Sequence, residues 1–101
     1  MLSKSEIERL LKKKEPIVAD MEMVAEARSW GLDDFNVSAE LIGTAYTYMK
    51  TKYKPNETLE DMELNLGIAM ESISRALKAL EAHGYLTISR ALKPYQYLVI
   101  K

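Results

Sequence analysis

The sequence predicts a mainly α-helical fold that ends in a small β-hairpin. Three patterns support this fold class: apolar residues recur every three or four positions as far as Leu80, Ser or Thr caps precede several of these runs, and apolar and polar residues alternate after Gly84. The chain has 101 residues, 48% of them hydrophobic, which is enough for one domain with a single modest core. We divide it into an N-terminal helical extension, residues 1–37, and a domain over residues 38–101.

Two helices are predicted in the extension. The first begins at a capping box formed by Ser5 and Glu8 and ends before Pro16. The second is expected to run from Pro16, a residue favoured in the first helical turn, to Gly31. It carries a predicted stripe of Val18, Met21, Val24, Ala25 and Arg28 at spacings of three and four. Residues 31–37, GLDDFNV, are the best linker candidate, and we expect a loop or hinge there.

A third helix is predicted to begin after Ser38, which is a favourable N-cap, and to end at Pro55. Its inward stripe contains Leu41, Ile42, Ala45, Tyr48 and Met49. Three lysines, Lys50, Lys52 and Lys54, are expected near its C-terminal end, where they balance the helix dipole.

Two shorter helices and a tight turn are predicted between Thr58 and Leu86. Thr58 and Asp61 form a capping box, so a helix should begin at Leu59 and end at Gly67, a residue that adopts the left-handed conformation readily. The next helix is predicted to begin near Met70, to span about 13 residues and to end at Gly84, with His83 in its last turn. Its buried stripe contains Ile73, Ala76, Leu77 and Leu80.

The C-terminal segment is predicted to be a hairpin with strands at about residues 85–89 and 95–100. The residues 90–94, RALKP, form its tip. Tyr95 and Tyr97 alternate on one strand face, where we expect them to pack against the helices rather than to stack on unpaired bases.

Residues 38–101 resemble the winged helix-turn-helix DNA-binding domains of prokaryotic transcription regulators. The matching positions are Leu59, residues 66–68 (LGI), residues 72–77 (SISRAL), Leu80 and residues 83–86 (HGYL). The resemblance implies a three-helix core, a recognition helix that starts near Met70 and a hairpin that acts as the wing. Two residues depart from the family pattern: Glu63 replaces a small residue between the two helices, and Ala69 replaces the usual Ser or Thr cap.

The resemblance implies that the recognition helix enters the major groove of double-stranded DNA, while the wing grips flanking backbone. The residues expected at the DNA are Met70, Glu71, Ser72, Ser74, Arg75, Lys78, Arg90 and Lys93. Arg75 can donate a bidentate pair to guanine or clamp a phosphate, and the alternative is an ion pair with Glu71 in the preceding turn. Lys78 is expected at a phosphate. For Arg90 and Lys93 the alternative to a DNA contact is that they only keep an exposed turn soluble.

Composition bounds the remaining function classes. The chain has 14 Lys and Arg against 15 Asp and Glu, a net charge of −1, whereas dedicated DNA-binding domains are often basic, so a basic face must arise locally. It has no cysteine and one histidine, so neither a thiolate site nor a histidine cluster for a metal is expected. The acidic pairs lack a partner base or nucleophile, and we expect no enzyme and no cofactor. No signal peptide or membrane span is recognisable, which favours a cytoplasmic protein.

The extension carries more apolar residues than a solvent-exposed segment should. It is expected either to fold back on the domain or to meet a second copy, and we favour dimerisation through this region. A homodimer would place two recognition helices about one DNA turn apart, on an inverted repeat. The leading expectation is a sequence-specific regulator of transcription. The alternatives are a replication or partition DNA-binding protein, or a winged domain whose recognition face binds another protein.

Overall fold

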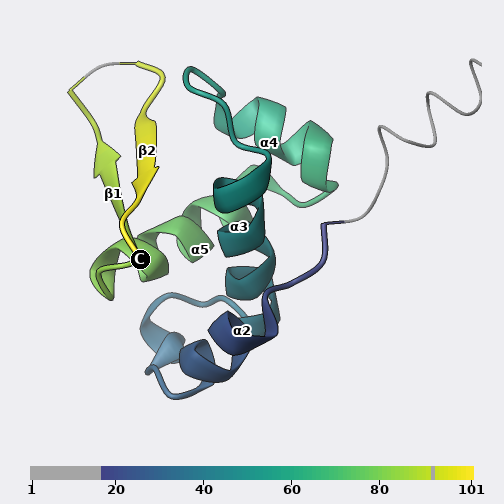
Figure 1. Cartoon of the computed structure of the whole chain (residues 1–101), viewed down its shortest axis with the longest axis vertical. Helices are drawn as coiled ribbons and strands as arrows, with labels where there is room; N and C mark the ends of the chain where they lie inside the picture. The colour runs from purple at the N-terminus through teal and green to yellow at the C-terminus, as the bar shows by residue number, and fades with distance from the viewer. Residues whose placement is uncertain (1–16, 92) are drawn as a thin grey trace, which may run out of the picture.

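The computed structural model describes residues 17–91 and 93–101, and these form a mainly helical fold with one two-stranded antiparallel sheet (Figure 1). The elements are α2 (Met21–Arg28), the 3-10 turn η1 (Leu32–Asp34), α3 (Ala39–Thr51), α4 (Leu59–Leu66), α5 (Met70–Ala82), β1 (Leu86–Ser89) and β2 (Gln96–Val99). This confirms the predicted combination of helices and a hairpin. The helix predicted to begin at Ser5 lies outside the described residues.

Helix α3 occupies the centre of the molecule, with α2 and α5 packed against it. Seven of its 13 residues are buried, so it is apolar over most of its circumference rather than along one stripe. A single core cluster joins it to the other elements through Val24 of α2, Met62 of α4, Leu77 of α5 and Leu86 of β1. Figure 1 shows α2 at one end of the molecule and α4 with the hairpin at the other.

Helix α2 is shorter than the sequence analysis predicted, and its buried face is different. It begins at Met21 because the side chain of Asp20 accepts a hydrogen bond from the backbone N–H of Met23 at 3.0 Å and caps the helix. Residues 17–20 are not helical. The buried residues are Met23, Val24 and Ala27. Of the predicted stripe only Val24 is buried, and Val18 and Met21 are 74% and 65% exposed.

The segment between α2 and α3 is a packed loop rather than a hinge. It contains η1, and the apolar side chains Leu32, Phe35 and Val37 pack against the core. Trp30 stacks on His83 with ring centroids 3.9 Å apart and an angle of 4° between the ring planes. His83 is the C-cap of α5 rather than part of its last turn. The described part of the extension therefore folds back on the domain.

The helix caps predicted at Ser38 and Thr58 are confirmed. Ser38 Oγ accepts from the N–H of Leu41 at 3.1 Å, and Thr58 and Asp61 form both hydrogen bonds of a capping box. Gly67 ends α4 in the left-handed conformation with φ 68°. Helix α3, however, ends at Thr51, because the chain leaves helical geometry at Lys52, before Pro55 is reached.

Gly43 is the point of closest approach between α2 and α3. A Cβ atom at this position would lie 2.4 Å from Cγ2 of Val24 and 3.0 Å from the carbonyl oxygen of Asp20. We expect Gly43→Ala to lower the free energy of unfolding by about 1 to 3 kcal/mol, because a methyl group is forced into a packed contact. Urea denaturation followed by circular dichroism measures this change.

The control is the same substitution in a Val24→Ala background, where the nearer contact is removed. The penalty of Gly43→Ala should be smaller there than in the wild type. An equal penalty in both backgrounds would contradict the assignment of this contact.

Candidate functional site

Helices α4 and α5 are joined by three residues, and the start of α5 is capped by a side chain from α4. Ala69 is the N-cap of α5 and makes no side-chain hydrogen bond. Instead Glu63 Oε2 accepts a hydrogen bond from the backbone N–H of Met70 at 2.8 Å. Glu63 therefore compensates for the missing cap at Ala69, since its carboxylate satisfies one of the unpaired N–H groups at the start of α5.

The outward face of α5 lines a shallow depression that we call the front hollow. Its volume is about 400 Å³, and it is lined by Leu59, Met70, Glu71, Ser74, Arg75 and Lys78. Five of the residues predicted at the DNA thus lie together on one face. Ser72 is half-buried and is not among these lining residues. On the opposite side Ile73, Ala76, Leu77, Ala79 and Leu80 are buried, which fixes the rotation of α5 about its axis.

The two cations of the front hollow, half-buried Arg75 and exposed Lys78, are loosely held. Arg75 Nη2 lies 3.9 Å from Glu71 Oε2, so the ion pair that the sequence analysis offered as an alternative is present. Such an exposed pair contributes at most about 1 kcal/mol to stability. Arg75 can therefore readily leave Glu71 for another anion. Lys78 is exposed, and no carboxylate of the described residues lies within 4.0 Å of its Nζ.

Arg90 ties the hairpin to α5. Its Nη1 and Nη2 donate to the two carboxylate oxygens of Glu81 at 2.8 and 2.7 Å, a bidentate geometry. The hydrogen bond from Arg90 holds the pKa of Glu81 below its usual value, and Glu81 in turn raises the pKa of Arg90. Arg90 was predicted to contact DNA from the tip, whereas the structure gives its guanidinium a partner within the molecule.

A second set of polar contacts fixes the other strand. Gln96 accepts from the backbone N–H of Asn56 at 3.0 Å and donates to the Asn56 side chain at 3.1 Å. The N–H of Tyr97 donates to the hydroxyl of Tyr53 at 3.2 Å, and the two rings pack edge to face. Tyr97 therefore packs against the helical part, as predicted, whereas the same prediction is wrong for Tyr95, which is 38% exposed. The role of Gln96 could not be predicted from the sequence, because its partner lies 40 positions earlier and no local pattern connects the two.

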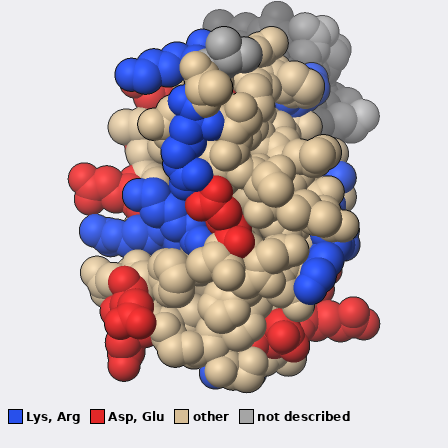
Figure 2. Space-filling view, turned by 90° about the vertical axis from the view of Figure 1, so that its left-hand side faces the viewer, with Lys and Arg blue, Asp and Glu red and all other residues tan. Residues whose placement is uncertain are grey.

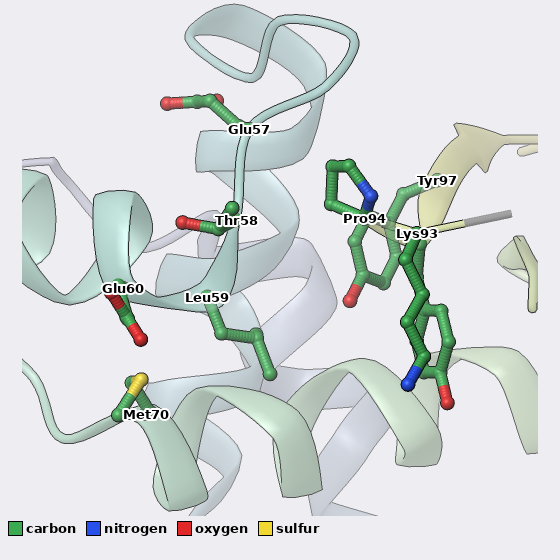
Figure 3. Close-up of a pocket in the computed structure, with 9 residues that line it drawn as sticks. Glu57, Thr58, Leu59, Glu60, Met70, Lys93, Pro94 and Tyr97 are labelled. Atoms are coloured by element: carbon green, nitrogen blue, oxygen red, sulfur yellow. The ribbon is translucent and has the colours of Figure 1, made fainter.

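Lys93 remains at the tip of the hairpin, above a second depression that we call the hairpin hollow. This depression of about 370 Å³ is lined by Glu57, Thr58, Leu59, Glu60, Met70, Lys93, Pro94, Tyr95 and Tyr97. Figure 3 shows Lys93, Pro94 and Tyr97 on one side of it and Leu59 and Met70 on the other. Because Leu59 and Met70 line both hollows, the two depressions are neighbours on the surface.

The face of the molecule that carries the hairpin is locally basic. Figure 2 shows Lys and Arg side chains gathered in a band over part of this face, with acidic side chains beside and below it. Lys50, by contrast, lies 3.6 Å from Asp20 and 4.6 Å from the ring centre of Tyr46, at the α2–α3 contact. The near-zero net charge therefore hides an uneven distribution.

The comparisons with known proteins add no relative: no family model, no curated protein and no solved structure matches the chain. Within residues 17–91 and 93–101, no group of three or more His, Asp or Glu side chains is placed to hold a metal ion. None of the helices in this part of the chain is long and apolar enough to cross a membrane.

The cap that Glu63 provides can be tested by two substitutions. Glu63→Ala should lower the free energy of unfolding by about 0.5 to 2 kcal/mol, the usual effect of losing a helix cap. Glu63→Gln should recover more than half of this loss, because its amide oxygen can still accept from Met70. Equal destabilisation by both variants in urea unfolding would show that the hydrogen bond is not the source of the effect.

The contact between Glu81 and Arg90 should make stability depend on acidity. Because the pKa of folded Glu81 is lowered, its stabilising contribution is present above the unfolded value near 4.5 and is lost as the pH falls below it. Glu81→Gln should therefore be less stable than the wild type at pH 7, by at most about 1 kcal/mol, and equal to it near pH 2. Glu60→Gln is the control, and a difference for Glu81→Gln that persists near pH 2 would argue against this pair.

Proposed function

We propose that the chain is a winged helix-turn-helix protein that binds double-stranded DNA sequence-specifically and regulates transcription. In this assignment α4 and α5 are the helix-turn-helix pair, α3 is the helix behind them, and the hairpin is the wing. The proposal is supported by the short turn at Gly67 and by the position of the hairpin beside α5. It does not rest on any relative.

One observation carries the proposal: α5 has one face buried in the core, while its other face is open and carries Ser74, Arg75 and Lys78. The major groove of B-DNA is wide enough for one α-helix whose exposed side chains reach base edges. In that orientation Arg75 exchanges its weak pair with Glu71 for a guanine edge or a phosphate. Lys78 and Lys93 neutralise backbone phosphates, and Arg90 acts by holding the wing through Glu81.

We further propose that the protein acts as a homodimer in the cytoplasm. Two copies would present their α5 helices to successive major grooves on an inverted repeat. Although the buried stripe of α2 is used within the protomer, Val18 before the helix and Met21 at its start remain exposed and provide apolar area for a second copy. The proposal includes no catalytic role.

The second candidate is a winged domain that binds another protein through the same face. It is favoured by the apolar lining of the hairpin hollow, which includes Leu59 and Pro94, and by the acidic residues Glu60 and Glu71 beside it. Aromatic and apolar side chains in a surface depression are more typical of a protein partner than of a phosphate backbone, and acidic side chains disfavour a phosphate.

Selection of bound fragments from random duplexes, followed by fluorescence anisotropy at several salt concentrations, tests the DNA proposal. Affinity should fall as salt rises, with a logarithmic slope of about 0.9 per neutralised phosphate. Lys78→Ala should reduce this slope by about 1 and weaken all sequences alike, while Arg75→Ala should relax specificity at one position if it reads a base.

The matched control for these two substitutions is Glu71→Gln, which removes an acid from the same face and should not weaken binding. If no duplex is retained at low salt, or if binding does not respond to salt, the DNA proposal fails. Binding to a protein partner that depends on Leu59 would then support the second candidate.

A further inference from the structure

The outward face of α5 changes its chemistry along the helix. At its N-terminal end Met70 is apolar and 37% exposed, and it lines both the front hollow and the hairpin hollow. One and two turns further on, Ser74, Arg75 and Lys78 provide a hydroxyl group and two cations to the front hollow. The two ends of this face therefore suit different parts of a ligand.

The N-terminal end is poorly suited to a phosphate. The N–H of Met70 already donates to Glu63, so this donor is not free for an anion, and Ala69 makes no capping contact. Two further carboxylates, Glu60 and Glu71, line the hollows on either side of Met70, and Figure 3 shows Glu60 next to the Met70 side chain. These carboxylates disfavour an anionic group at this end, and the exposed Met70 side chain favours an apolar one.

Duplex DNA offers one apolar group in its major groove, the C5-methyl group of thymine. The N-terminal residues of a recognition helix are those that reach base edges, and Met70 is the first residue of α5. Its thioether side chain is unbranched and flexible, so it can adapt to a methyl group, and Leu59 provides an apolar wall beside it.

We infer that Met70 is a specificity-determining residue that contacts the methyl group of one thymine in each half-site. This inference rests on the proposed DNA-binding function and gives it a sequence preference. In this arrangement Arg75 and Lys78 bind the DNA backbone or a guanine further along the groove. The carboxylates around Met70 keep phosphates away from the N-terminal end of α5.

The test replaces each thymine of the selected site, one at a time, by deoxyuridine, which removes only the methyl group and preserves base pairing. Replacement at one position per half-site should weaken binding by the wild-type protein about four-fold, the amount expected for one buried methyl-sized group. Met70→Ala should bind the thymine duplex about four-fold more weakly than the wild type and should not distinguish thymine from uracil at that position.

The matched control is Leu64→Ala, because Leu64 is an apolar residue of α4 that is 83% exposed and lines neither hollow. This variant should keep the full thymine preference. If wild-type protein binds DNA but no single uracil matters, or if Met70→Ala keeps the preference, the inference is wrong and the proposed function stands. If no duplex binds at all, both are wrong.

Discussion

Burial of the apolar stripe of α5 against α3 and its neighbours is the constraint on which the rest of the molecule depends. Ile73, Leu77 and Leu80 are almost completely buried, and each such side chain contributes roughly 1.5 to 3 kcal/mol when removed from water. The exposed ion pairs on the same helix contribute at most about 1 kcal/mol each. Apolar burial rather than charge pairing therefore decides how α5 is rotated, and with that rotation the front hollow is directed outward.

Polar contacts then place the parts around α5. Glu81 of α5 holds Arg90, the residue after β1, and Asn56 in the loop after α3 holds Gln96 of β2. That loop is itself fastened by Tyr48, whose hydroxyl donates to Glu57 and accepts from Asn65. Burial, followed by the hydrogen bond to Glu57, raises the pKa of Tyr48 to about 12, so this donor stays protonated through the physiological range. The hairpin hollow thus lies between elements that these hydrogen bonds tie together.

The charge distribution on the surface depends on which charged residues have partners within the molecule. Several charged residues are used inside the molecule: Arg90 holds Glu81, and Lys50 lies by Asp20 at the α2–α3 contact. Glu63 serves as a cap for the next helix. With these groups engaged, the cations that α5 and the hairpin tip offer outward are Arg75, with its weak partner, and Lys78 and Lys93. A net charge of −1 is therefore compatible with a locally cationic face, which is what the proposed function requires.

The sequence by itself determined the elements whose signals are local. The caps at Ser38 and Thr58, the left-handed turn at Gly67 and the buried stripe of α5 each depend on residues a few positions apart, so their pattern was sufficient. Only the tertiary structure decided the start and face of α2, because several apolar residues there fit more than one helical register and contact with α3 selects Met23, Val24 and Ala27. The tertiary structure also decided that Arg90 is paired within the molecule, since its partner Glu81 lies nine positions earlier on a different element. It likewise decided the contact of Gln96, whose partner lies 40 positions earlier. Such contacts form only when the chain has folded, and no periodicity in the sequence encodes them.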